Sequence, residues 1–310
     1  MVSFPNGKKF AFTIFDDTDL STVANTKPVY DLLDRCGLRT TKSTWVYPSR
    51  GKCAGQSLAD ADYRDWLIEL SRKGFEIGLH NIGDGSFSRE EIAAGLEIFR
   101  ETFGCYPKVH TNHVSNPDNL YWWSKRFEFP FNLLYQLASR VRRRAGSLVG
   151  GDDPAGSHYW GDLCRDRITY VRNLTVNQID TLRMDRRMPY HIKSKPLVKY
   201  WFSSSDGHDV RVFNSLITRK NVEQLEATGG VCIVYTHFAY GFVKHGVLDE
   251  TFRQGIEFLA SRGGWFVPVG TLLDHLISDR GGEDPGYAYR LWTNLRWGID
   301  RILKQARFGI

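Results

Sequence analysis

The stretch K-F-A-F-T-I-F-D-D-T, from Lys9 to Thr18, decides the fold. An apolar and β-branched run that is continuous rather than alternating is typical of a strand buried on both faces of a parallel sheet. The run stops at two adjacent aspartates, Asp16 and Asp17. Paired carboxylates beside a buried strand are costly unless they share a cation or a proton, although Asp also favours the cap of a following turn. The stretch therefore predicts a buried strand that ends at a polar site.

The rest of the chain alternates short apolar runs with amphipathic segments. We expect further strands at 41–46, 75–80, 108–113, 231–237 and 265–269, and helices at 28–37, 59–73, 219–227, 248–261 and 271–278. Another helix is expected after Ser88, because Ser88 and Glu91 form an S-x-x-E capping box. Strands that alternate with helices form a mainly parallel sheet, whose reactive residues gather at the carboxyl ends of the strands. The predicted fold class is α/β, a distorted (β/α) barrel.

The middle of the chain does not follow this alternation. Residues from about 115 to 214 contain aromatic and turn-rich stretches, and we interpret them as a long insertion that covers the catalytic face. Residues 281–310 are predicted to add an amphipathic helical extension. The expected organisation is thus one barrel domain over 1–280, with the insertion inside it and the helix after it.

Bulk composition agrees with one large hydrophobic core, since 42% of the 310 residues are hydrophobic and 25% are charged. The sequence begins without an apolar leader and contains no apolar run of the ~20 residues that a membrane span needs, so we expect a cytoplasmic protein. The five cysteines are scattered and predict neither a disulfide framework nor a cysteine zinc site. A net charge of +6 allows anionic glycans or lipid head groups as partners, but no nucleic-acid-binding motif accompanies it.

Several residues suited to metal chemistry follow the predicted strands. His80 ends one strand, Asp84 follows it by four residues, and His113 and His237 end two others. Together with an aspartate, such ligands form an open site for a divalent ion, most suitably zinc, that keeps a water molecule. His237 projects from the end of an apolar strand and suits a general acid. For each histidine alone, a structural role remains the competing interpretation.

Three motifs resemble the polysaccharide deacetylases of carbohydrate esterase family four. F-T-I-F-D-D-T at 12–18 is similar to the family's T-F-D-D-G, which implies that Asp16 is the catalytic base and Asp17 a metal ligand. H-N-I-G-D at 80–84 is similar to H-[ST]-x-x-H and implies His80 as a ligand, with Asp84 in place of the second histidine. V-Y-T-H at 234–237 resembles the late L-x-H motif, so that His237 inherits the role of the acid.

Two other family motifs are altered in this chain. The family's R-x-P-Y is replaced by V-H-T-N-H-V at 109–114, without an arginine to support the base. His113 in this stretch then ligates the metal, contacts the substrate or holds Asp16, and Asn112 is placed beside the reacting carbonyl as a substrate contact. In the position of the motif that orients the acid histidine stands Y-W-G-D at 159–162, from which Trp160 and Asp162 are assigned to substrate binding.

The resemblance implies an enzyme that uses a divalent metal, most suitably zinc, to remove an N-acyl group, in the first place acetyl, from an amino sugar of a polysaccharide or a lipid-linked glycan. The C-terminal segment has apolar residues at helical spacing, at 291, 295, 299, 302 and 306, with arginines and a lysine around them. Such a helix either docks on the barrel or contacts an anionic membrane surface on the cytoplasmic side.

Two other functional classes remain open from the sequence. Asp17-Thr18-Asp19 spells D-x-D, a signature of metal-dependent glycosyltransferases, although this interpretation gives no role to His80 or His237. The altered motifs also allow a non-enzymatic carbohydrate-binding protein, which would bind no metal. Binding of a nucleotide sugar would favour the first alternative, and the absence of bound metal would favour the second.

Overall fold

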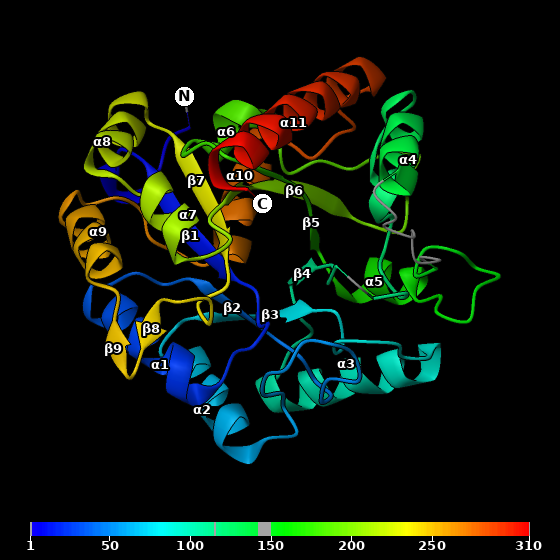
Figure 1. The fold of residues 1–310 in the computed structure, drawn as a ribbon, viewed down its shortest axis with the longest axis horizontal. Coiled ribbons are helices and arrows are strands. Elements are labelled where there is room, and N and C mark those ends of the chain that lie inside the picture. The colour runs from blue at the N-terminus through cyan, green and yellow to red at the C-terminus, as the bar shows by residue number, and fades with distance from the viewer. Residues whose placement is uncertain (1, 115, 142–149, 310) are drawn as a thin grey trace.

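Seven parallel strands form a closed barrel in the computed structural model, which describes residues 2–114, 116–141 and 150–309 (Figure 1). In barrel order the strands are β1 (Ala11–Asp16), β2 (Thr41–Thr44), β3 (Glu76–His80), β4 (Val109–Thr111), β5 (Tyr170–Val176), β6 (Tyr200–Asp206) and β7 (Val231–Thr236). The order along the chain equals the order around the barrel, and β7 closes it by pairing with β1. The predicted (β/α) barrel is confirmed.

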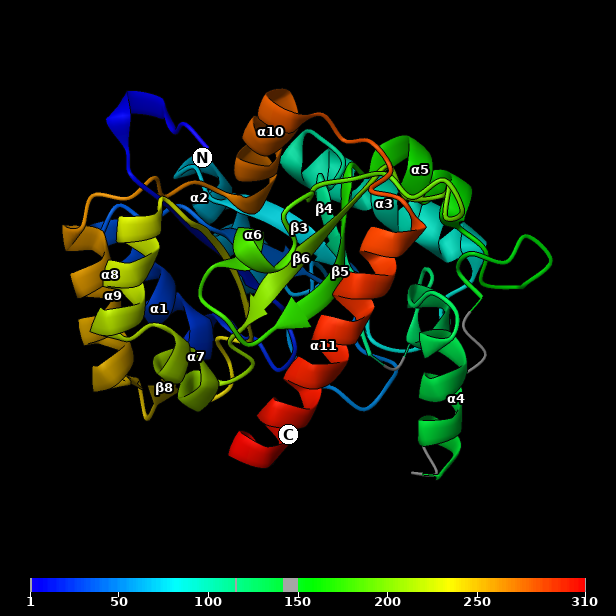
Figure 2. The same ribbon diagram turned by 90° about the horizontal axis from the view of Figure 1, so that it is seen from above.

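Helices surround the strands, as the alternating sequence predicts (Figures 1 and 2). They are α1 (Val23–Arg35), α2 (Ala61–Arg72), α3 (Arg89–Phe103), α4 (Phe131–Val141), α5 (Gly161–Arg167), α6 (Thr181–Met184), α7 (Val210–Leu216), α8 (Arg219–Thr228), α9 (Glu250–Ser261), α10 (Val269–Arg280) and α11 (Tyr287–Phe308). Short elements complete the fold: two 3₁₀ turns, η1 (Pro5–Gly7) and η2 (Trp123–Arg126), and an antiparallel hairpin of β8 (Val243–Lys244) and β9 (Val247–Leu248). In the described residues, no helix combines the length and apolarity needed to cross a bilayer.

Local sequence signals place several helix ends. Ser88 caps α3, its hydroxyl accepting from the Glu91 backbone while the Glu91 carboxylate accepts from the Ser88 backbone, which is the predicted capping box. α1 begins earlier than the expected 28–37, because Thr22 and Asn25 form a second capping box. Pro28 therefore lies inside the first turns of that helix instead of starting it.

The expected strand at 265–269 is reduced to a single bridge between Trp265 and Ala11. β7 occupies one side of β1 along its whole length, and β2 pairs on the other side only with Phe15 and Asp16. The beginning of β1 has a free side, where Trp265 forms its bridge, and α10 begins soon afterwards at Val269 with Pro268 as its N-cap.

The middle of the chain differs from its interpretation as an insertion, because β5 and β6 lie between 115 and 214 and complete the barrel. The sequence does not predict β6, because the second half of its Y-W-F-S-S-S-D is polar although all of Trp201 to Asp206 is buried. Tertiary partners satisfy three of its polar side chains: Ser203 donates to Asp185, Ser205 shares a hydrogen bond with Thr181, and Lys304 donates to Asp206. A hydrophobicity pattern cannot report such a strand.

A buried ion pair joins the first two strands. Asp16 in β1 and Lys42 in β2 are register partners, and both are fully buried. The Lys42 ammonium lies 3.1 Å from the Asp16 carboxylate, which also accepts hydrogen bonds from the Tyr30 hydroxyl and the Phe238 backbone. Because both charged groups are removed from water, the attraction between them has to replace the lost hydration.

We predict that Lys42→Met lowers the free energy of unfolding by about 3–5 kcal/mol, since it leaves a buried carboxylate without its counter-charge. Urea denaturation measures this change. The matched control is Lys27→Met, because Lys27 pairs with Asp31 on the surface of α1 and exposed pairs contribute less than about 1 kcal/mol. Equal destabilisation by both substitutions would contradict the assigned role of the buried pair.

Candidate metal and catalytic site

The polar residues that follow β1, β3, β4 and β7 meet at one rim of the barrel. Asp19 comes from the loop after β1, His80 is the last residue of β3, His113 follows β4, and His237 follows β7. All four side chains are buried. The strands are parallel, so their carboxyl ends face the same way and residues distant in the chain become neighbours.

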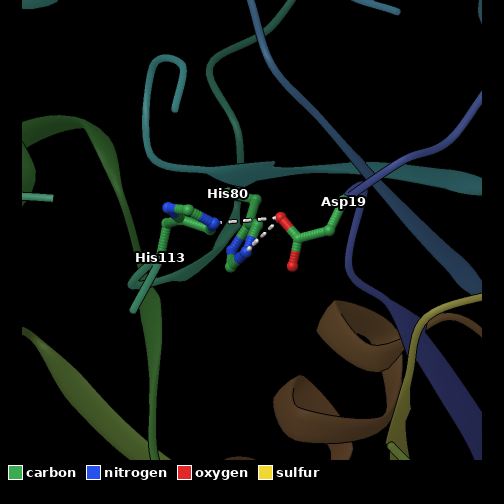
Figure 3. A group of neighbouring side chains, drawn as sticks. All are labelled: Asp19, His80 and His113. Carbon is green, nitrogen blue, oxygen red and sulfur yellow. Dashed lines mark ion pairs between the residues drawn. The ribbon is translucent and has the colours of Figure 1, made fainter. Parts of the chain in front are cut away.

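Asp19, His80 and His113 form a compact set of ligand atoms (Figure 3). Asp19 Oδ1 lies 3.1 Å from His113 Nε2 and 3.6 Å from His80 Nε2, and one ligand atom from each residue lies within 4.8 Å of the other two. Asp19 Oδ1 and His113 Nε2 are buried without any hydrogen-bond partner. Buried polar atoms without hydrogen bonds are rare, and one carboxylate with two imidazoles is a donor set typical of a divalent cation. These residues therefore fit a metal ion.

Hydrogen bonds on the far side of each ring turn Nε2 toward Asp19. His80 Nδ1 lies 3.1 Å from the Thr111 carbonyl oxygen, and His113 Nδ1 lies 3.0 Å from Asn116 Oδ1. Asn116 donates its own amide to the Gly83 carbonyl, which fixes its oxygen toward His113. Because these oxygens accept, Nδ1 carries the proton in both rings and Nε2 presents its lone pair, as a metal-binding histidine requires.

Asp17 forms the second part of the site through Arg172 in β5. The guanidinium donates two hydrogen bonds to the carboxylate, at 3.1 and 2.5 Å, and Thr111 donates a third at 3.2 Å. Burial favours a higher pKa for Asp17, but the charges of Arg172 and His80 outweigh it and hold the pKa below its ordinary value. Asp17 is thus an ionised acceptor whose nearer oxygen lies 4.0 Å from His80 Nε2.

His237 forms the third part, on the other side of Asp19. Its Nε2 lies 2.9 Å from Asp19 Oδ2, its Nδ1 lies 2.9 Å from the His208 carbonyl oxygen, and Tyr240 stacks on the ring. Burial favours a lower pKa for His237, but its hydrogen bond to Asp19 and the charge of that carboxylate raise the pKa above the ordinary value. The ring is held in one orientation and is set up to carry a proton.

The structure places Asp16 and Asp84 outside this cluster. Asp16 is engaged by Lys42, Tyr30 and the Phe238 backbone, as described above. Asp84 lies behind His113, 3.4 Å from its Nδ1, and accepts hydrogen bonds from the Ser49 hydroxyl and the Cys53 backbone. Asp84 also belongs to a second set of ligand atoms, with Cys53 and His113, so it touches the side of the ring that faces away from Asp19.

The three predicted substrate contacts take part in structural interactions. Both polar atoms of the Asn112 side chain bond to the Leu120 backbone and close the loop between them. Trp160 is buried, and its indole donates to the Asp118 carbonyl. Asp162 forms a bidentate ion pair with Arg89 at 2.6 Å for both bonds, and this pair is more than a third exposed on both sides. Their assignment to substrate binding stays a prediction.

Sequence reasoning missed two residues of the site. Asp19 stands two positions after Asp17, but its D-x-D pattern favours a glycosyltransferase and does not by itself indicate this metal site. No pattern in the sequence indicates that Arg172 belongs to the site. It lies in β5, which the sequence does not predict, and it is distant along the chain from the altered R-x-P-Y stretch. The arginine absent from that stretch has a spatial counterpart on β5, because the barrel brings Arg172 to Asp17.

A search of protein-family models gives no match to the chain, and neither does a search of curated protein sequences. Solved structures do match over most of its length. One is the allantoinase Puue, at 11% sequence identity and a TM-score of 0.52, which covers 90% of this chain and 93% of that chain. Another is a "probable Polysaccharide deacetylase from Pseudomonas aeruginosa PAO1", at 10% identity and a TM-score of 0.50, with 90% and 94% covered. The chain therefore has the fold of the polysaccharide deacetylases, as a divergent example of it, and the resemblance seen in its motifs is confirmed at the level of the fold.

Proposed function

We propose that this protein is a metal-dependent amide hydrolase that removes an N-acyl group, in the first place acetyl, from an amino sugar of a polysaccharide or a lipid-linked glycan. The observation that carries the proposal is the set of Asp19, His80 and His113 ligand atoms within 4.8 Å of one another, with Asp17 and His237 beside it. A cation site next to an ionised acceptor and a protonated donor is the arrangement that hydrolysis of an amide needs.

In this proposal Asp19, His80 and His113 hold the divalent ion, for which zinc suits the nitrogen and oxygen donors. When bound, the ion supplies Lewis acidity, which polarises the acyl carbonyl and lowers the pKa of a water molecule. The family motif implies Asp16 and Asp17 as base and ligand, but the contacts favour a shift along the loop, to Asp17 as base and Asp19 as ligand. Asp16 is already paired with Lys42, whereas Asp17 faces the cluster.

The remaining steps belong to the side chains around the ion. Asp17, held by Arg172 and Thr111, accepts a proton from the attacking water. His237 donates its Nε2 proton to the nitrogen of the leaving amine as the carbon–nitrogen bond breaks. The products are a carboxylic acid and a free amino sugar. Both rival classes are less well supported, since a transferase gives no role to His237 and a simple binding protein none to the Asp17–Arg172 pair.

Metal binding gives a test that does not depend on activity. We expect the purified protein to bind Zn²⁺ in isothermal titration calorimetry, and His80→Ala and His113→Ala to weaken binding by roughly a hundredfold or more, since each removes a ligand. Asp84→Asn should weaken it by about 10–100-fold, because Asp84 orients His113 from behind. Asp162→Asn, which changes an exposed carboxylate, is the control. Binding unaffected by the histidine substitutions would exclude the site.

Turnover separates Asp17 from Asp16 as the base. Release of free amine from N-acetylated amino sugars should fall by about 10²–10⁴ in kcat for Asp17→Asn, with KM little changed, because only proton transfer is lost. Asp16→Asn, measured on protein shown to be folded, should keep most of the turnover. The opposite order would return the role of the base to Asp16. Allantoin belongs in the same panel, and its hydrolysis in place of sugar deacylation would reassign the substrate class.

Arg172 is proposed as a positioning residue that acts through Asp17. Arg172→Ala should lower kcat with little effect on KM, since the carboxylate loses both of its hydrogen bonds from the guanidinium. Arg172→Lys should restore part of the lost turnover, because it returns the charge but not the paired geometry. A substitution that lowers stability without this graded effect on kcat would mean that the pair is only structural.

A further inference from the structure

The C-terminal helix α11 is oriented with its polar side toward the barrel. All of its buried residues are polar or charged: Arg290, Thr293, Asn294, Asp300 and Lys304. Its exposed side carries large apolar residues: Trp292, Leu295, Ile299, Ile302 and Leu303, which are 40–71% exposed. These exposed positions recur every three or four residues and form one stripe along the helix. An ordinary surface helix has the reverse arrangement.

Ionic contacts explain why α11 docks in this orientation. Lys304 and Arg301 both donate to the buried Asp206 carboxylate at the end of β6, at 2.9 and 3.0 Å. Asp300 accepts from the Asn177 backbone after β5. The barrel needs these charges because Asp206 is 1% exposed and would otherwise lack a counter-charge. The apolar stripe is consequently turned outward, away from the contacts that hold the helix.

Helix α4 lies beside α11 (Figure 2), and it exposes apolar residues as well. The two helices meet where Phe127 and Tyr135 pack against Trp297. On α4, three leucines are about half exposed: Leu133, Leu134 and Leu137, at 47–56%. Exposed apolar side chains gathered on two adjacent helices are the feature that marks an interaction surface, whereas single ones scattered over a surface need no explanation.

The charges on these two helices have one sign at the surface. Asp300 is the only acidic residue in the sequences of α4 and α11, and it is buried. The exposed arginines of these helices are Arg140 at the end of α4 and Arg307 on α11, whereas Arg296 is half-buried and donates to Met184 Sδ in α6. An apolar stripe that contains a tryptophan and is flanked by arginines, without exposed carboxylates, complements the acyl boundary and the anionic head groups of a bilayer.

We propose that α11 and α4 together form a membrane-contact surface, on which the protein lies at the face of a bilayer that contains anionic lipids. The apolar stripe of α11, joined by the leucines of α4, enters the head-group region, and Arg140 and Arg307 pair with lipid phosphates or carboxylates. The helices lie along the surface without crossing it. This inference is independent of the proposed hydrolysis, and it brings the protein to the place where a lipid-linked substrate would be met.

Vesicle co-sedimentation of the full chain tests the proposal. We expect binding to vesicles of phosphatidylcholine with phosphatidylglycerol, weaker binding to phosphatidylcholine alone, and a further loss at high salt because charge attraction is screened. Ile302→Asp and Leu303→Asp should each weaken partitioning by about tenfold or more, since each removes an inserted apolar side chain. Arg140→Glu with Arg307→Glu should remove the preference for the anionic vesicles.

Val247→Asp is the matched control, because Val247 on β9 is 69% exposed and lies outside the two helices. It should bind vesicles like the unsubstituted protein, and thermal unfolding of every variant checks that the fold is retained. Failure of the unsubstituted protein to bind anionic vesicles, or binding that Ile302→Asp and Leu303→Asp leave intact, would overturn the proposal. So would a dimer, seen by light scattering, that these two substitutions dissociate, because the surface would then be covered by a second copy.

Discussion

Three carboxylates within four residues are buried at the end of β1, and each must have its own counter-charge. Burial in a medium of low polarity favours the neutral form of Asp16, Asp17 and Asp19, and only a nearby cation or hydrogen-bond donor offsets that cost. Asp16 is paired with Lys42, Asp17 with Arg172, and Asp19 with histidines. The site depends on this separation, because Asp16 is held in the core by Lys42, whereas Asp17, although paired with Arg172, and Asp19 both lie beside the histidines.

The closed parallel barrel supplies these partners from separate strands. Lys42 comes from β2, next to β1, whereas Arg172 comes from β5 on another part of the barrel wall. A guanidinium reaches Asp17 through the interior, where it also packs over the ring of Tyr235. Closure through β7 brings His237 to Asp19. The site at the rim therefore depends on two things: the position of the strand ends, and the cationic residues that pair with the buried aspartates.

The same constraint acts at the end of β6 and determines how the C-terminal helix is displayed. Asp206 is buried, and α11 provides its counter-charges through Arg301 and Lys304. Because the helix docks through its charged residues, its apolar side chains face outward. Exposing apolar surface to water costs free energy, and contact with a bilayer would remove that cost. The ion pairs of Asp206 with Arg301 and Lys304 thus determine which side of α11 forms the surface proposed for membrane contact.

The sequence by itself determined the α/β class and five of the barrel strands, because β1 and β7 are continuous apolar runs and the helices between strands carry caps such as Ser88 and Glu91. It also placed His80, His113 and His237 at strand ends, since local pattern marks where a strand stops. Only the tertiary structure decided which aspartate faces the cluster, because Asp16, Asp17 and Asp19 differ in their partners and not in their local sequence. It alone revealed β5 with Arg172, and the strand β6, whose Ser203, Ser205 and Asp206 bond to residues distant in the chain. It also decided which side of α11 faces outward, because periodicity defines the two faces of a helix, whereas the buried charge of Asp206 selects the one that docks.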